Sequence, residues 1–214
     1  FHRWHRRIAA RLLSSLPYDS ALDVGCGAGQ HLALLARLRP GARLVGTDLS
    51  PRALEAAAAR CPGEYRVLDI EQARLPETFD LVTCFQVVEH LAGDAAAVRN
   101  LAAMSKRWVL VSTMQGTMAP HEAELGHVRR YTRNGLESLL RSAGVEPVRV
   151  VEWGRPFYSL FELIQSHLPR GRAHVIGRFG LGFALLSAVL HALYFLNVSR
   201  RGPLLMILAE RRGL

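Results

Sequence analysis

The sequence predicts an α/β fold, and two observations carry this prediction. Short apolar segments typical of buried strands alternate along the chain with helix-like segments, the pattern of a sheet built from strand–helix–strand units. Three of the strand-like segments also end at or next to an acidic residue, at positions 23, 48 and 69. Of the 214 residues, 50% are hydrophobic and 21% charged, so the chain can bury a complete core. We therefore expect one domain that spans residues 1–214.

The first strand and the loop that follows it are the most informative part of the chain. Residues 21–24 form a short apolar strand that contains Asp23, and Gly25, Gly27 and Gly29 follow at every second position. Glycine has no β-carbon, so a ligand can lie directly against the backbone of such a loop. A helix over residues 31–38 follows and would direct its free N–H groups to the same place. This arrangement predicts a nucleoside site.

The spacing of the glycines excludes the usual dinucleotide fingerprint. That fingerprint, G-x-G-x-x-G, would need a third glycine at position 30 or at position 32, where Gln30 and Leu32 stand. The chain instead carries D-x-G-x-G-x-G from Asp23 to Gly29, with Cys26 between the glycines.

The next two strands each provide an acid for the rest of a nucleoside. The strand over residues 42–48 ends in Asp48, about 20 residues after the loop, where a carboxylate can accept both ribose hydroxyls. Leu49 follows and can cover one face of an adenine. The strand over residues 65–70 carries Asp69, which can accept from the adenine amino group, and Ile70, which can pack on the ring.

The remaining elements follow in the same alternating order. Ser50 is placed as the N-cap of a helix over residues 53–60, with Pro51 at its first position. Thr132 is placed as the N-cap of a later helix that ends before Gly144. The further strands are expected at residues 79–86, 108–113, 145–153 and 203–212, and the later helix at residues 133–143.

In this order the motifs resemble those of the class I S-adenosylmethionine (SAM) methyltransferases over residues 18–140. The resemblance implies a Rossmann-like α/β/α sandwich with seven mostly parallel strands in the order 3-2-1-4-5-7-6, the last one antiparallel. It also implies SAM as cofactor and S-adenosylhomocysteine as product. The residues that it assigns to the cofactor are Asp23, Gly25, Cys26, Gly27, Gly29, Asp48, Leu49, Asp69, Ile70, Gln86 and Val87. The alternative is an α/β domain in which these acids and glycines are only turn residues.

The second half of the chain indicates the type of acceptor. The pattern H-x-R-x-Y-T from His127 to Thr132 is similar to that of small-molecule methyltransferases related to the ubiquinone-biosynthesis O-methyltransferases, where it lies over the acceptor pocket. We place His90 and His127 as the candidate catalytic bases, because an oxygen acceptor must lose its proton. Alternatively, His90 bonds only to backbone and His127 only shapes the pocket. Residues 1–17 are expected to form an N-terminal helix or lid, with His2 and His5 toward the cofactor.

The segment from Gln86 to His90 resembles the E-x-x-E-H stretch that binds a divalent ion in some O-methyltransferases. Gln86 stands where the first carboxylate would be, and an amide is a weaker ligand than a carboxylate for a hard cation. We therefore predict no metal.

Residues 154–202 are expected to form an apolar helical insertion before the final strand. Its segment 179–196 has no charged residue and approaches the length of a membrane span. We argue against a span, because the final strand must return to the sheet and arginines flank both ends of the segment. The segment is instead a lid over an apolar acceptor, a homodimer interface, a helix on the membrane surface, or a helix packed on its own domain.

The net charge of +9 comes almost entirely from arginines, and no nucleic-acid-binding module accompanies it, so we expect no nucleic-acid partner. Three cysteines without metal-ligand spacing and the lack of a visible signal peptide favour the cytoplasm, with peripheral membrane contact possible through the insertion. The sequence thus predicts methyl transfer to an apolar small-molecule or lipid-like acceptor, on oxygen. The alternatives are small-molecule N-methylation, nucleic-acid methylation and a non-catalytic SAM-binding scaffold.

Overall fold

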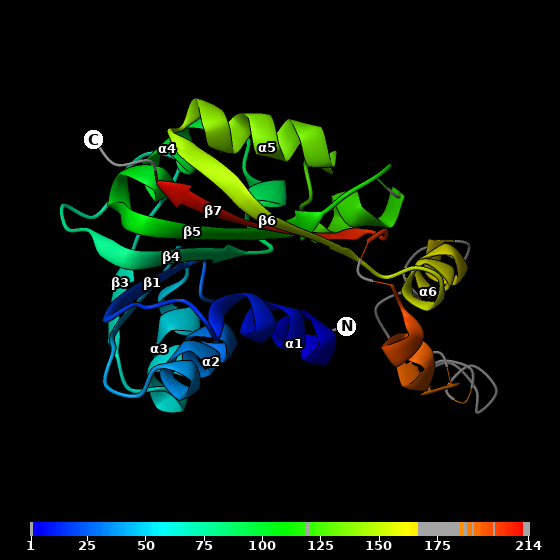
Figure 1. The fold of residues 1–214 in the computed structure, drawn as a ribbon, viewed down its shortest axis with the longest axis horizontal. Helices are drawn as coiled ribbons and strands as arrows, with labels where there is room; N and C mark the ends of the chain where they lie inside the picture. The colour runs from blue at the N-terminus through cyan, green and yellow to red at the C-terminus, as the bar shows by residue number, and fades with distance from the viewer. Residues whose placement is uncertain are drawn as a thin grey trace.

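The computed structural model describes residues 2–118, 120–166, 185, 188–189, 191–198 and 200–211. Its sheet has seven strands in the order β3-β2-β1-β4-β5-β7-β6, as the resemblance implies (Figure 1). The neighbouring pairs among β1 to β5 are parallel, and β7 lies antiparallel between β5 and β6. The strands are β1 (Ser20–Val24), β2 (Arg43–Asp48), β3 (Glu64–Val67), β4 (Phe79–Phe85), β5 (Ser105–Met114), β6 (Val145–Trp153) and β7 (Leu204–Arg211).

Helices cover both faces of this sheet (Figure 1). One layer contains α1 (His2–Leu13), α2 (Gln30–Leu38) and α3 (Pro51–Arg60), and the other contains α4 (Asp94–Met104) and α5 (Arg133–Ser142). α6 (Phe157–Ser166) lies beyond the end of the sheet. Short 3₁₀ turns η1 (Val88–His90), η2 (Pro120–Leu125) and η4 (Tyr194–Leu196) complete the described elements.

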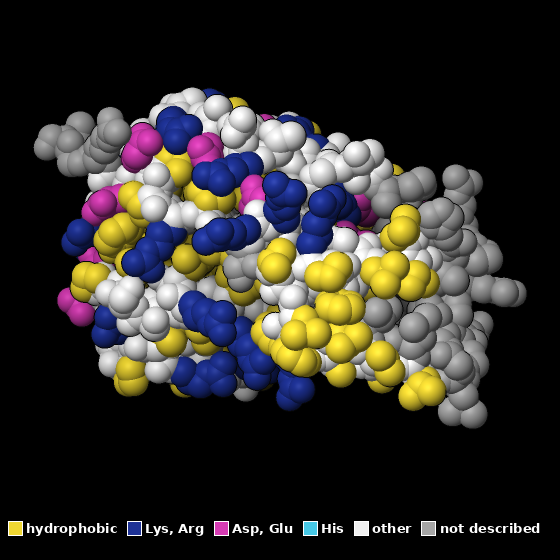
Figure 2. Space-filling view, turned by 45° about the vertical axis from the view of Figure 1, so that its right-hand side comes forward, with side chains coloured by type: hydrophobic (Ala, Val, Ile, Leu, Met, Phe, Trp, Pro, Cys, Tyr) yellow, Lys and Arg dark blue, Asp and Glu magenta, His cyan; other side chains and the backbone are white. Residues whose placement is uncertain are grey.

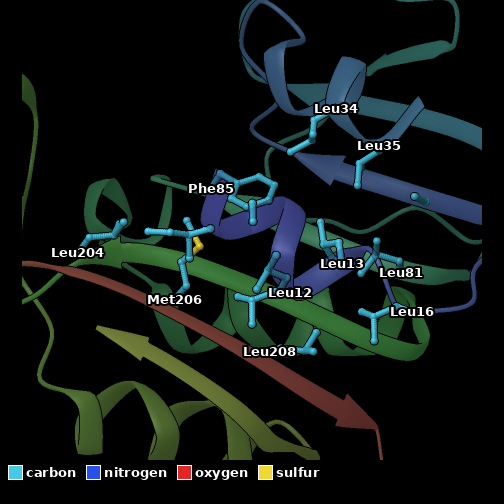
Figure 3. Packing of buried hydrophobic residues seen from close by; sticks show 14 of the residues in the cluster. Leu12, Leu13, Leu16, Leu34, Leu35, Leu81, Phe85, Leu204, Met206 and Leu208 are labelled. Atoms are coloured by element: carbon cyan, nitrogen blue, oxygen red, sulfur yellow. The ribbon is translucent and has the colours of Figure 1, made fainter. Parts of the chain in front are cut away.

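Two large apolar clusters lie on the two sides of the sheet. Figure 3 shows the one under α1, where Leu12 and Leu13 lie near Leu81 of β4 and Met206 of β7. These side chains are at most 5% exposed. Burial of this apolar area, roughly 25 cal/mol per Å², holds α1 against the sheet. The N-terminal segment is therefore part of the folded domain.

The strand ends that carry the site lie together because of the register. Val24 of β1 pairs with Thr47 of β2 and with Cys84 of β4, so these three parallel strands end at one edge. β3 ends at Val67, three residues earlier than expected, because its partner β2 ends at Asp48. Asp69 and Ile70 therefore lie in the loop after β3, still at the same edge of the sheet.

The helix ends follow their capping residues. The hydroxyl of Ser50 accepts from the amide of Ala53, and that of Thr132 accepts from the amide of Gly135. α5 ends one residue before its expected end, and Gly144 follows in the left-handed region at φ 83°. α4 is a helix that the sequence analysis did not assign; its hydrophobic periodicity is weak because alanines occupy much of it.

The described part of the insertion packs on the end of the sheet through aromatic rings. Trp153 of β6 stacks on Tyr158 of α6 with ring centroids 5.6 Å apart, and the ring of Tyr194 meets it edge-on at 5.7 Å. Trp4 of α1 stacks on the same indole at 6.0 Å. The expected apolar helix over residues 179–196 lies partly outside the described residues. Among those that are described, no helix has the length and hydropathy required of a membrane span.

Candidate functional site

A cavity of about 250 Å³ lies at the carboxyl edge of β1, β2 and β4. Parallel sheets of this kind bind their ligands at this edge. The cavity brings together most of the expected cofactor residues and one of the two expected bases. Its lining consists of Val24, Gly25, Asp48, Leu49, Leu68, Asp69, Ile70, Gln86, Val87, His90 and Leu91. Asp23, Cys26, Gly27 and Gly29 do not line it.

Asp48 is held by the glycine loop itself. Its Oδ2 accepts from the amide of Gly27 at 2.9 Å, and its Oδ1 accepts from the amide of Ser50 at 2.9 Å. Each carboxylate oxygen has a second lone pair, so the group can still accept from two vicinal hydroxyls. The two amides fix the plane of the carboxylate before a ligand arrives.

The far end of the cavity has the features of an adenine site. Asp69 accepts from the amide of Glu71 at 3.0 Å, which orients its side chain. Ile70 is buried beneath the cavity, and Leu49 is 62% exposed at its rim. A flat aromatic ring between these two aliphatic side chains would cover the exposed surface of Leu49.

The glycine loop and the end of β4 approach each other too closely for a side chain. Gly25 has φ 68°, and a β-carbon on it would lie 2.3 Å from Cγ2 of Val87. Gln86, directly before Val87, has φ 56°, a conformation that non-glycine residues rarely adopt. Such backbone strain gathers at ligand sites, where the surrounding structure imposes it. Here it turns the chain out of β4 and under the glycine loop.

Asp23 lies beneath the loop and is 1% exposed. Its Oδ1 accepts from the hydroxyl of Thr83 at 2.7 Å, whereas its Oδ2 has no hydrogen-bond partner among the described residues. Burial raises the pKa of this carboxyl to about 7. A buried acceptor without a partner is costly, and a cationic ligand group or a bridging water would satisfy it.

The two expected bases lie against each other. The rings of His90 and His127 meet edge to face with centroids 4.6 Å apart. His90 Nδ1 is 3.1 Å from the carbonyl of Gly126, and His127 Nδ1 is 3.1 Å from Oε1 of Glu122. Carbonyl and carboxylate oxygens only accept, so a neutral imidazole at either position would carry its proton on Nδ1 and its lone pair on Nε2. Burial and the neighbouring His90 lower the pKa of His127, which favours its neutral form.

Glu89 completes a group of three potential metal ligands, one carboxylate and two imidazoles. Among the described residues, the ligand atoms of Glu89, His90 and His127 lie within 4.8 Å of one another. Glu89 is fully buried; its Oε2 accepts from Thr113 at 2.9 Å, and its Oε1 has no partner in the described part of the chain. Burial raises the pKa of this carboxyl to about 7. The three side chains could hold a divalent cation.

A polar chain links the N-terminal helix to the cavity. His5 of α1 is buried, and its ring nitrogens lie 3.0 Å from His31 Nε2 and 2.8 Å from the hydroxyl of Ser112. The same hydroxyl accepts from the amide group of Gln86 at 3.3 Å. His5 thus lies behind the cavity wall, whereas His2 lies on the outer surface of α1.

Sequence reasoning missed the charged neighbours of His127. Glu122 and Arg130 flank it in the chain, and no spacing rule joins an acid in a 3₁₀ turn to a histidine five residues later. Glu89 was visible as part of the segment ending at His90, but its burial was not.

Comparisons with known proteins identify the family and the fold. A family model described as a methyltransferase domain matches residues 22–107. The ubiquinone biosynthesis O-methyltransferase of Chromobacterium violaceum is 32% identical over 186 residues, covering 82% of this chain and 70% of that protein. The protein of the same name from Albidiferax ferrireducens is 39% identical over 106 residues, covering 45% of this chain and 41% of that protein. The chain thus spans less than half the length of this second relative.

The crystal structure of a magnesium protoporphyrin IX methyltransferase from Synechocystis with bound S-adenosylhomocysteine has a similar fold. The TM-score is 0.62 at 16% sequence identity, and the match covers 99% of this chain and 84% of that one. At this identity the likeness concerns the fold alone.

Proposed function

The chain belongs to the class I SAM-dependent methyltransferases, and we propose that it transfers a methyl group from SAM to an oxygen atom of an apolar small-molecule or lipid-like acceptor. The observation that carries this proposal is the position of His90. It lines the same 250 Å³ cavity as Asp48, Asp69 and Gln86. We take its imidazole as the proton acceptor that meets an acceptor hydroxyl beside the methyl group.

The residues of the cavity fit SAM. Asp48 would accept from the ribose hydroxyls, and Asp69 would accept from the adenine amino group. Asp23 has a buried oxygen without a described partner, which would face the methionine end. Gly25, which lines the cavity, lets the loop pack directly against Val87 at the end of β4. SAM supplies an activated methyl group on a sulfonium, and S-adenosylhomocysteine is the product.

The protein's part in the reaction is alignment and removal of a proton. Holding the acceptor in line with the methyl group supplies most of the advantage of an enzyme over solution. The Nε2 lone pair of His127, or of His90, takes the proton from the acceptor hydroxyl as the new carbon–oxygen bond forms. A neutral imidazole of this tautomer needs no rearrangement to do so.

A divalent cation is a second candidate for activating the acceptor hydroxyl, because three potential metal ligands, Glu89, His90 and His127, lie together. Two imidazoles and one carboxylate suit a transition-metal ion better than Mg²⁺. The other carboxylate of the E-x-x-E-H stretch is replaced by the amide of Gln86. Bound there, a cation would lower the pKa of the acceptor hydroxyl. We expect turnover to survive extensive treatment with a chelator. Loss of turnover that returns only on adding Mn²⁺ or Zn²⁺ would move the proposal to the metal.

The insertion supports an apolar, membrane-associated acceptor. Residues 154–202 contain six arginines and one glutamate. Large apolar side chains in its described part are exposed, namely Leu160, Leu163, Leu185, Val189, Phe195, Leu196 and Val198. Figure 2 shows such side chains gathered on one part of this face, with basic side chains beside them and few acidic ones. An apolar surface bordered by arginines fits the headgroup region of an anionic bilayer.

The experiment that tests the proposed function uses SAM labelled on its methyl group. The protein is incubated with cell extract, and label is counted in lipids, small molecules, protein and nucleic acid. We expect label in the lipid or apolar small-molecule fraction, on oxygen. Label in nucleic acid, in protein, or on nitrogen would overturn the acceptor class, and SAM binding without label in any fraction would favour a scaffold.

A further inference from the structure

A cluster of buried charges lies next to His127, between η2 and α6. Glu122 is 2% exposed, and the side chain of Arg130 is 8% exposed. The Nε of Arg130 lies 2.9 and 2.8 Å from the two carboxylate oxygens of Glu122, and its NH2 lies 2.9 Å from Glu162 of α6. Its remaining guanidinium nitrogen donates to the carbonyl of Gln115 at 3.0 Å. Each of the three guanidinium nitrogens of Arg130 thus donates to a group within the protein.

Glu122 serves two donors at once. Its Oε1 accepts from Arg130 and also lies 3.1 Å from His127 Nδ1. A backbone hydrogen bond also joins the two residues, since the amide of His127 donates to the carbonyl of Glu122 at 3.0 Å. A carboxylate held from behind by an arginine has little freedom to follow a moving imidazole, so the imidazole must follow the carboxylate.

We propose that Glu122 is a positioning residue for methyl transfer: it fixes His127 as the Nδ1–H tautomer and directs the Nε2 lone pair to the acceptor, with Arg130 and Glu162 holding Glu122 in place. This inference rests on the proposed function, with His127 rather than His90 taken as the base. It assigns the orientation of that base to three residues outside the cavity.

The anchoring of the carboxylate supports this role. Glu122 and Glu162 both accept from the guanidinium of Arg130, so the carboxylate that faces Nδ1 of His127 is held from α6 as well as from its own turn. A carboxylate in this position orients an imidazole without taking its proton.

Burial explains why the cluster persists although salt bridges are expensive to bury. Removing one partner of a buried ion pair leaves an uncompensated charge, which costs far more than the pair contributes. Replacing a carboxylate by its amide keeps the shape but removes the charge. The variant Glu122→Gln is therefore the sharpest probe, and Glu124→Gln, exposed on the same 3₁₀ turn, is its matched control.

The tautomer is measured directly by nitrogen NMR of histidine-labelled protein, without substrate. We expect wild-type His127 to give the signals of the Nδ1–H form. In Glu122→Gln we expect these signals to change to a mixture of tautomers, and in Glu124→Gln to stay as in the wild type. An Nε2–H form in the wild type overturns the proposal, whether or not Glu122→Gln folds.

Kinetics with the full chain test the consequence for catalysis. We expect Glu122→Gln to lower kcat about 10–100-fold, in the range found when the partner that orients a functional histidine is lost, with the KM for SAM within about twofold. Glu122→Asp keeps the charge and should recover part of kcat. If His127→Ala is inactive but Glu122→Gln keeps the kcat of the wild type, the proposal is overturned. Wild-type kcat in His127→Ala instead refutes the base role in the proposed function, and the catalytic meaning of Glu122 with it.

Discussion

At the scale of single residues, the burial of Asp23 connects the fold to the affinity expected for the ligand. It is almost completely buried at the end of β1, and burial raises its pKa to about 7, against the single hydrogen bond from Thr83 that favours its charged form. If Asp23 receives the cationic amino group of the methionine moiety, only its ionised form binds well. Affinity for SAM then depends on the pH near neutrality.

We therefore expect SAM to bind about 10-fold more tightly at pH 8 than at pH 6, since ionisation of a group with a pKa near 7 is largely complete over this interval. Titration calorimetry of the wild type and of Asp23→Asn measures this. The variant should bind more weakly and lack this pH dependence, and comparing the two removes any titration of the ligand. An equal pH dependence in both proteins would show that Asp23 does not face the ligand's charge.

The single residues of the cavity could be foreseen to the extent that they belong to local patterns. Asp48 and Asp69 follow strands, and Gly25 belongs to a spaced loop, so short stretches of sequence reveal them. The pairing of Glu122 with His127 and Arg130 could not be foreseen, because it depends on how an irregular loop folds back on itself. The strain at Gln86 was equally hidden, since nothing in its neighbours requires a positive φ.

At the scale of elements, the docking of α1 depends on neutral histidines. His5 is buried against His31 and Ser112, and His31 stacks on Phe85 with ring centroids 4.0 Å apart. Burial lowers the pKa of His31 to about 4 and holds that of His5 well below its ordinary value. Protonation of either ring would leave a charge beneath the helix.

This arrangement predicts that His31 destabilises the folded state in acid. Between pH 6.5 and pH 4 the unfolded chain binds a proton at His31 that the folded chain does not. The stabilisation from a neutral His31 is therefore complete above about pH 6.5 and is lost as the pH falls toward 4, by roughly 3 kcal/mol. The raised pKa values of Asp23 and Glu89 act with the opposite sign, because the folded protein holds their protons up to about pH 7.

Urea unfolding of the wild type and of His31→Gln, at pH 7 and at pH 5, separates these contributions. Asp23 and Glu89 are common to both proteins, so their effect cancels in the difference. We expect the free energy of unfolding at pH 5, relative to that at pH 7, to be lower in the wild type than in His31→Gln. An equal change in the two proteins would mean that His31 does not resist protonation in the folded state.

Elements were foreseen where hydrophobic periodicity or a cap marks them, as Ser50 does for α3 and Thr132 for α5. β3 proved shorter than expected because a parallel strand cannot extend beyond its partner. α4 went unassigned because alanines give it little periodicity, and its burial comes from the sheet that it covers.

At the scale of the whole molecule, the strand order came from the resemblance to a family and not from local pattern, since a seven-stranded order is a long-range property. The structure confirms that order, including the antiparallel β7. The role of the insertion is a different matter. Composition alone allowed a lid, a dimer interface, a membrane-surface helix or a helix packed on its own domain. The exposed apolar residues with flanking arginines favour the membrane surface.

We expect the protein to sediment with vesicles of phosphatidylglycerol and much less with those of phosphatidylcholine. A double substitution of Leu163→Asp and Phe195→Asp should abolish most of this binding, because it places charge on two exposed apolar positions of the insertion. Val148→Asp, at an exposed apolar position on β6, is the control. If the double variant still binds the vesicles, the insertion is not the membrane-binding surface. If the wild type has the mass of a dimer in solution and the variant that of a monomer, the surface is a homodimer interface.

The central claim is that the cavity at the carboxyl edge of the sheet binds SAM through Asp48. Titration calorimetry of SAM with the wild type, with Asp48→Asn and with Glu55→Ala, which lacks an exposed acid of α3, tests it most directly. We predict that Asp48→Asn loses about 2 kcal/mol of binding free energy, roughly 30-fold in Kd, with its circular dichroism spectrum unchanged, and that Glu55→Ala binds as the wild type does. Unchanged affinity in Asp48→Asn, or no SAM binding by the wild type, would contradict the account.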